Sequence, residues 1–169
     1  PMIKAAEENP DFQVFMKLCD ETRKLKVRTN ADTPEDAARA RAFGAEGIGL
    51  FRTEHMFYGK NSEEPLFKLR KMIHSKTLAE RKSALDELFP HVKHDVKGTM
   101  AAMDGYPVTF RTLDPPLHEF VPTRVDEREK LASSLGISLE ELNKRADSLH
   151  ENNPMMGHRG VRLGITYPE

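Results

Sequence analysis

Residues 47–55 read GIGLFRTEH, and this stretch gives the first indication of the fold. The apolar run 47–51 has the composition of a buried strand, and it is followed directly by Arg52, Thr53, Glu54 and His55. In parallel α/β folds the ligand lies at the carboxyl ends of the strands, where polar side chains meet solvent. We therefore expect a buried strand that ends in a cluster of functional side chains.

The residues before this strand predict a second strand and a helix. LKVRTNAD (25–32) reads as a strand, and Thr33 and Pro34 read as the N-cap and the first-turn proline of a helix. The helix is expected to run to about Phe43, with Gly44 as its C-terminal cap. Two strands separated by one helix in so short a span predict parallel pairing through a right-handed crossover.

The rest of the chain continues this alternation. A third strand is expected in PVTFRTL (107–113). Apolar spacing and capping residues predict helices at 10–25, around 66–73, from Thr77 to Phe89, at 94–103, at 126–135 and from Ser138 onward. The pattern suggests a doubly wound sheet or part of an eightfold barrel. A complete barrel takes about 250 residues, so a chain of 169 residues would hold roughly half of one.

Composition excludes several classes of function. With 26 basic and 27 acidic residues, the chain offers no overall field for nucleic acid or a membrane surface. No apolar stretch approaches the roughly 20 residues that span a bilayer, and no targeting signal opens the chain. One cysteine, Cys19, excludes an internal disulfide. We expect a soluble protein from the cytoplasm or an organelle interior, and the sequence leaves that choice open.

Three arginines are the candidate ligand-binding residues. Arg52 and Arg111 lie near the ends of predicted strands, and Arg159 lies in the glycine-flanked motif MMGHRG. A guanidinium group grips a phosphate or carboxylate through two hydrogen bonds while it stays charged. Glu54 and Asp114 are expected to orient these groups. The alternative is that the arginines form ordinary structural ion pairs, and spacing alone leaves both interpretations open.

Three motifs carry a family resemblance. GAEGIGLFRTEHMF (44–57), VTFRTLDPPLHEF (108–120) and NPMMGHRGVRLGITYPE (153–169) resemble the start of the phosphoenolpyruvate (PEP)-binding domain of the pyruvate, phosphate dikinase family. The resemblance extends over nearly the whole chain. Phosphoenolpyruvate synthase and Enzyme I of bacterial sugar transport share the strand-end arginines, but they do not normally contain the motifs RTEHMF or LDPPLHEF.

The resemblance implies a fold and a site. It implies a fragment in which residues 1–23 are a linker helix from a missing swivelling phosphohistidine domain. Residues 24–169 would be the N-terminal half of a (β/α)8 TIM-type barrel with extra helices. Arg52, Arg111 and Arg159 would bind the phosphoryl and carboxylate groups of PEP or pyruvate, supported by Glu54, Asp114, His55 and Asn30.

The resemblance also implies an activity for the parent enzyme, which is expected to be a homodimer. It would interconvert ATP, pyruvate and phosphate with AMP, PEP and diphosphate through a phosphohistidine. Its Mg²⁺ ligands and its catalytic cysteine would come from later strands, so no complete metal or catalytic site is expected in this chain. One alternative is a non-catalytic binding or self-assembling module that pairs through exposed strand edges. The other is a related PEP-utilising enzyme, either phosphoenolpyruvate synthase or Enzyme I of sugar transport.

The remaining histidines and methionines have plain interpretations. None of the seven histidines lies in the glycine- and serine-rich motif that carries the phosphoryl group in this family. His118 and His158 adjoin the arginine motifs, as His55 does, and are expected to line or support the pocket. The others are expected to face solvent: His74, His91, His94 and His150. Four methionines are expected to fill the core: Met100, Met103, Met155 and Met156.

Overall fold

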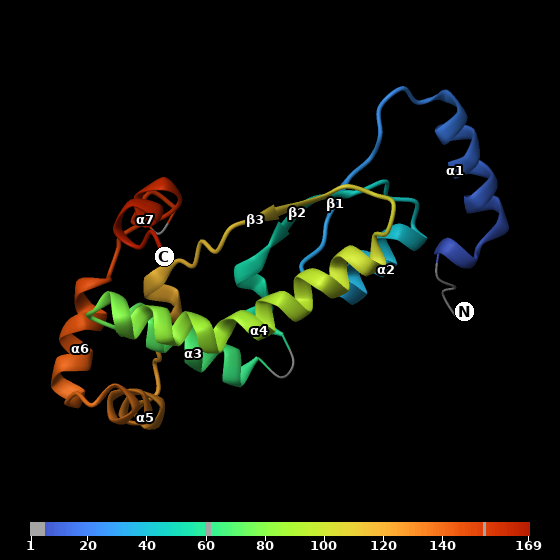
Figure 1. Cartoon of the computed structure of the whole chain (residues 1–169). Helices are drawn as coiled ribbons and strands as arrows, with labels where there is room; N and C mark the ends of the chain where they lie inside the picture. The colour runs from blue at the N-terminus through green and yellow to red at the C-terminus, as the bar shows by residue number, and fades with distance from the viewer. Residues whose placement is uncertain (1–5, 60–61, 154) are drawn as a thin grey trace. The chain divides into compact units, whose positions relative to one another are not determined.

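This computed structural model describes residues 6–59, 62–153 and 155–169, which fall into two compact units (Figure 1). The first unit comprises the chain up to Phe51 together with Val96–Phe110. The second comprises Arg52–Asp95 and Arg111–Glu169. Helices and a small sheet with a parallel strand pair make up the chain, which confirms the α/β class.

The sheet has three strands. They are β1 (Thr29–Asn30), β2 (Ile48–Arg52) and β3 (Val108–Arg111), in the order β1-β2-β3. β1 and β2 are parallel, with Thr29 opposite Ile48, as predicted. β1 is only two residues long, much shorter than the predicted strand 25–32, and its register shifts between Thr29 and Asn30.

Local capping chemistry sets the helices of the first unit, which are α1 (Pro10–Thr22) and α2 (Pro34–Ala42), preceded by the 3-10 turn η1 (Ala6–Glu8). Thr33 Oγ1 accepts a hydrogen bond from Asp36 N at 3.1 Å, as expected of an N-cap. Gly44 has a φ of +92°, which favours glycine, directly after the C-cap residue of α2. The predicted helices at 10–25 and 33–43 are therefore confirmed to within a few residues.

The core of the first unit forms around β2. Ile48 and Phe51 are fully buried, and the Phe51 ring lies 5.1 Å from the Phe110 ring. Ile48 N donates to Pro107 O at 2.9 Å. Gly47 lies so close to the same oxygen that a Cβ atom there would come within 2.8 Å of it. The strand predicted at 47–51 is therefore confirmed to within one residue as β2, with Ile48 and Phe51 buried and Gly49 exposed.

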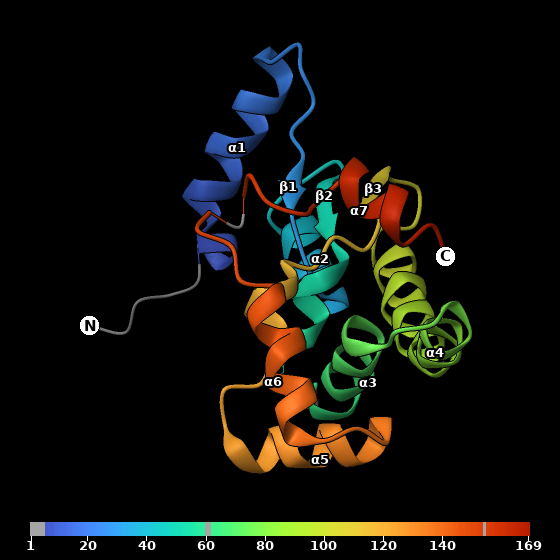
Figure 2. The same cartoon turned by 90° about the vertical axis from the view of Figure 1, so that its left-hand side faces the viewer.

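Helices dominate the second unit. They are α3 (Glu63–His74), α4 (Leu78–Ala102), α5 (Val125–Leu135), α6 (Leu139–Ser148) and α7 (Val161–Thr166), with two 3-10 turns, η2 (Thr53–Tyr58) and η3 (Leu117–Phe120). α3, α5 and α6 lie side by side (Figures 1 and 2). Leu131, Ala132 and Leu142 form a buried cluster between α5 and α6, against which Phe67 of α3 packs.

One helix differs from the sequence prediction. The two helices expected at 77–89 and 94–103 are a single helix, α4, which runs through Pro90 and ends in the first unit. A proline inside a helix removes one backbone donor and costs about 3 kcal/mol. Leu88 on one side of Pro90 and Thr99 on the other are fully buried. This burial stabilises both halves and outweighs the local defect.

Burial also corrects some expectations for single residues. His74 is buried rather than exposed, because α5 and α6 cover the end of α3. Met103 is buried as expected, but Met100, Met155 and Met156 are more than half exposed, because their segments turn these side chains outward. Among the helices of the described residues, none has the length and apolar character required to cross a membrane.

Candidate functional site

The ends of β2 and β3 lie side by side in the second unit. Arg52 is the last residue of β2, and Arg111 is the last residue of β3. Thr53 Oγ1 donates a hydrogen bond to the carbonyl oxygen of Arg111 at 3.1 Å. This bond holds the backbone after Arg52 against the backbone of Arg111. Two of the three candidate arginines therefore come from adjoining strand ends, as the sequence predicts.

Glu54 and Arg111 form an ion pair at this edge. The Glu54 side chain is 4% exposed, whereas the Arg111 side chain is 31% exposed and reaches toward solvent. A buried carboxylate needs a cation, so Glu54 fixes the position of the guanidinium group. Within the described part of the chain, Arg111 Nε and Glu54 Oε2 are buried and have no hydrogen-bond partner.

Asp114 holds the third arginine. Its Oδ2 accepts a hydrogen bond from an Arg159 terminal nitrogen at 3.1 Å, and its Oδ1 accepts one from Gly160 N at 2.9 Å. Both side chains of the ion pair are 15% exposed. Gly160 has a φ of +59°, a conformation that side chains disfavour. One carboxylate thus pins both the guanidinium group and the backbone that follows it. Arg159 Nε is buried, and no described group accepts a hydrogen bond from it.

The supporting residues are placed differently. The His55 ring stands edge-on to the Tyr58 ring at 6.0 Å, within η2. His118 lies beside His150, with ring centroids 6.5 Å apart, at a separate surface cavity that Arg128 also lines. Asn30 belongs to the first unit, where its backbone pairs with Leu50.

A mostly apolar cavity of about 350 Å³ adjoins the Asp114 contacts. Its walls come from α3, α4, the segment after β3, and the 158–169 segment, and they include Ile73, Leu85, Leu113, Gly160 and Tyr167. Sequence reasoning missed this cavity because its walls are far apart along the chain and none has a motif. It also missed the Gly160 N–H as a partner of Asp114. The glycine beside Arg159 was the only signal for that contact.

Two of the candidate arginines are held by carboxylates and keep a free donor. Glu54 pairs with Arg111, and Asp114 pairs with Arg159. Arg111 Nε and Arg159 Nε are buried donors that need an acceptor. The described residues contain no group of three or more His, Cys, Asp or Glu side chains that could hold a metal ion.

Comparisons with known proteins relate this chain to enzymes that use PEP. A family model described as "PEP-utilising enzyme, PEP-binding domain" matches residues 6–169. The chain is 52% identical over 164 residues to pyruvate, phosphate dikinase of Clostridium symbiosum, covering 97% of this chain and 18% of that protein. It is 52% identical over 161 residues to the chloroplastic pyruvate, phosphate dikinase 1 of Oryza sativa subsp. japonica, covering 94% and 17%. It is 51% identical over 159 residues to pyruvate, phosphate dikinase of Giardia intestinalis, covering 94% and 18%. The chain spans less than a fifth of the length of these relatives.

Proposed function

The chain belongs to the family of PEP-utilising enzymes, within their PEP-binding domain, and we propose that it forms part of the substrate site of a pyruvate, phosphate dikinase. In this role Arg52, Arg111 and Arg159 bind the phosphoryl and carboxylate groups of PEP or pyruvate. Glu54 and Asp114 hold two of the guanidinium groups in place through their ion pairs. His55 and Asn30 are proposed to support them.

The observation that carries this proposal is the pair of unmatched donors on Arg111 and Arg159. Each Nε–H is buried and lacks an acceptor among the described residues. A buried donor without a partner costs about 1–3 kcal/mol, and a charge-assisted bond to an anion removes that cost. Because both donors belong to ion-paired guanidinium groups, they are fixed in position before the anion arrives. PEP carries both phosphoryl and carboxylate oxygens and is a suitable acceptor for them.

The proposed chemistry explains why arginine is used. Enolate formation and phosphoryl transfer concentrate negative charge on a three-carbon acid, and fixed guanidinium groups stabilise such charge. The parent enzyme is proposed to exchange ATP, pyruvate and phosphate for AMP, PEP and diphosphate through a phosphohistidine on a swivelling domain. Mg²⁺ would neutralise further charge in that enzyme. Its ligands are proposed to come from later strands of that enzyme.

The proposal includes the architecture of the parent enzyme. Residues 24–169 would form the first half of a (β/α)8 barrel, and residues 1–23 would form the linker helix from the swivelling domain. The parallel pair of β1 and β2, joined through α2, supports this interpretation because it is the repeating unit of such barrels. The parent is proposed to be a homodimer.

A calorimetric titration of this chain with PEP tests the proposal. Arg111→Lys and Arg159→Lys keep a cation beside Glu54 and Asp114 but remove the Nε donor and the planar fork. Each is expected to weaken PEP binding by about tenfold or more, since one charge-assisted bond contributes about 1.5–3 kcal/mol. Arg124→Lys is the matched control, because Arg124 is exposed and pairs with the exposed Asp126. Absence of PEP binding, or equal losses in all three variants, would refute the proposed site.

A second candidate function is self-association. Val14, Phe15 and Leu18 of α1 are each at least 60% exposed, and apolar side chains in this arrangement favour contact with another protein. Analytical ultracentrifugation over a wide range of protein concentration separates the two cases. A dimer that dissociates on dilution, and that Phe15→Lys weakens, would support self-association. A monomer at every concentration would exclude it.

A further inference from the structure

The segment that carries Arg159 is held by a contact with α4 as well as by Asp114. The guanidinium group of Arg81, in the first turn of α4, lies over the ring of Tyr167 at 4.8 Å from its centroid. Arg81 also forms an ion pair with Glu169, in which the two side chains are 14% and 5% exposed. A cation over an aromatic face is attracted by the ring quadrupole, and burial strengthens this attraction. Arg81 therefore binds two residues of the 158–169 segment at once.

Tyr167 connects this contact to the residue before Arg159. The ring of Tyr167 stacks on the ring of His158, with centroids 5.9 Å apart and an angle of 22° between the planes. His158 is fixed further by a 2.5 Å hydrogen bond between its Nε2 and Thr166 Oγ1. Its backbone N donates to Glu151 Oε1 at 2.6 Å. Contacts thus run without a break from Arg81 through Tyr167 and His158 to the backbone of Arg159.

The cavity beside this segment makes the contact important. The cavity of about 350 Å³ has Gly160, Leu163 and Tyr167 on one wall, and Leu85 of α4 on another. Close packing does not restrain the segment on that side, so it has room to move inward. Specific contacts therefore restrain the segment on that side, and they include Asp114 and Glu151 at one end and Arg81 at the other.

We propose that Arg81 and Tyr167 are positioning residues for Arg159 and set the substrate affinity of the arginine site without contacting the substrate. This inference rests on the proposed function of that site. If Arg81 releases Tyr167, His158 loses its stacking partner and the backbone that carries Arg159 gains freedom. A small displacement of a binding group is enough to lose its directed hydrogen bonds.

Four variants separate positioning from general stabilisation. Tyr167→Leu and Arg81→Met remove the ring and the cation, whereas Tyr167→Phe and Arg81→Lys keep them. Two measurements apply to each protein. One is hydrogen exchange of the Gly160 amide, which reports whether this amide keeps its hydrogen bond to Asp114. The other is PEP affinity by calorimetry. The Leu131 amide, in the core of α5, reports global unfolding.

The expected result is a local change. Tyr167→Leu and Arg81→Met should speed exchange of the Gly160 amide by about tenfold and weaken PEP binding by about tenfold, with Leu131 unchanged. The conservative variants should restore both values to within about threefold of the wild type. As a matched control, Tyr106→Leu breaks the similar pair of Arg41 and Tyr106 in the first unit and should change neither value.

Two results would overturn the proposal in distinguishable ways. Unchanged Gly160 exchange and PEP affinity in Tyr167→Leu and Arg81→Met would show that the contact does not position Arg159, while wild-type PEP binding would leave the proposed function intact. Failure of the wild-type chain to bind PEP would refute the proposed function, and the claim on affinity with it, whatever the exchange data show. If Tyr167→Leu also speeds exchange of the Leu131 amide, this variant unfolds globally. The Arg81→Met variant then tests whether the contact positions Arg159.

Discussion

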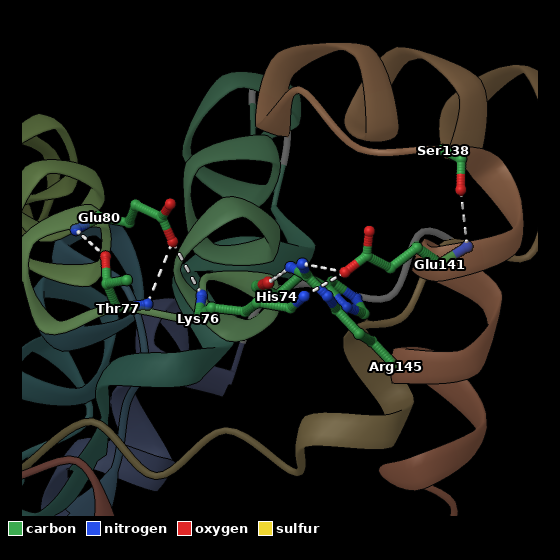
Figure 3. A network of polar contacts seen from close by, with 7 residues as sticks. All are labelled: His74, Lys76, Thr77, Glu80, Ser138, Glu141 and Arg145. Carbon is green, nitrogen blue, oxygen red and sulfur yellow. Dashed lines mark hydrogen bonds and ion pairs between the residues drawn. The ribbon is translucent and has the colours of Figure 1, made fainter.

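Lowering the pH from about 7 to about 4 is expected to destabilise the protein through His74. This residue ends α3, and it is only 2% exposed. Neither of its ring nitrogens has a hydrogen-bond partner among the described residues. Arg145 of α6 donates to the carbonyl oxygen of His74 and to Glu141, so a guanidinium group is fixed beside the ring (Figure 3).

The environment of His74 disfavours its charged form. Burial is the largest cause, followed by the positive charges of Arg145, Arg70 and Arg128, and together they lower the pKa of His74 from 6.5 to about 4. Two carboxylates, one on α5 and one on α6, lie in the region of His74, but both already form ion pairs with basic side chains. Glu127 pairs with Arg70, and Glu141 pairs with Arg145 and Lys76. Neither carboxylate is therefore available to stabilise a protonated ring.

The sign and size of the effect follow from linkage. Because the pKa of His74 is lower in the folded than in the unfolded protein, its contribution is fully present above pH 6.5 and is lost as the pH falls toward about 4. One pKa unit corresponds to about 1.4 kcal/mol. The interval from 6.5 to about 4 therefore corresponds to a loss of about 3 kcal/mol in the free energy of unfolding.

Urea unfolding at a series of pH values measures this loss. Other groups titrate in the same range, so the comparison is with His74→Leu, which fills a similar volume and cannot be protonated. The wild type is expected to lose about 3 kcal/mol more than His74→Leu between pH 7 and pH 4. His94→Leu, at an exposed position of α4, should keep the wild-type dependence. Parallel curves for the wild type and His74→Leu would refute the reasoning.

Two further predictions concern the strand-end site, and urea unfolding measures both. Gly160→Ala should lower the free energy of unfolding by about 1–3 kcal/mol, because φ there is +59° and a side chain strains that backbone. Gly164→Ala, in a helix with no neighbouring atom within 4 Å of an added Cβ, should be neutral or slightly stabilising, and an equal loss in both variants would contradict the strain. Glu54→Gln should cost about 1.5–3 kcal/mol because it removes the charge that pairs with Arg111. Asp126→Asn, in an exposed pair, should cost less than about 1 kcal/mol, and the reverse order would show that Glu54 does not hold Arg111.

Local chemistry made much of the fold predictable. Helix starts at Thr33 and Ser138 follow from side chains that accept a backbone N–H three residues on, and the structure has both bonds. Gly136 ends α5 with a φ of +65°, which few residues besides glycine adopt. The buried strand before Arg52 was predictable because an apolar run that stops abruptly at charged residues is typical of a strand that ends at the edge of a parallel sheet.

Features that depend on tertiary packing were not predictable. The continuity of α4 through Pro90 depends on burial of residues on both sides of the proline, which no local signal shows. His74 carries a polar ring at a helix end and looks exposed until α5 and α6 are placed over it. The contact between Arg81 and Tyr167 joins the start of α4 to the 158–169 segment, and neither residue lies in a recognisable pair of motifs.

The candidate site could be predicted only in part. The strand-end positions of Arg52 and Arg111 could be predicted, because β2 and β3 can be recognised as strands from the sequence. Glu54 and Asp114 were expected to orient the arginines, but which arginine each one pairs with is known only from the structure, where Glu54 contacts Arg111 and Asp114 contacts Arg159. Their role in substrate binding stays a prediction. The unmatched Nε donors could not be foreseen, because they depend on burial of individual atoms.

The central claim is that the buried Nε–H groups of Arg111 and Arg159 receive a phosphorylated acid, and a titration followed by NMR at arginine Nε tests it most directly. With ¹⁵N-labelled protein, addition of PEP should shift the Nε–H signals of Arg111 and Arg159, which lack acceptors in the described structure. The signal of Arg124, whose Nε already donates to Asp126 at 3.0 Å, should stay in place. Equal movement of all three signals would indicate nonspecific anion binding, and movement of Arg124 alone or of none would contradict the account.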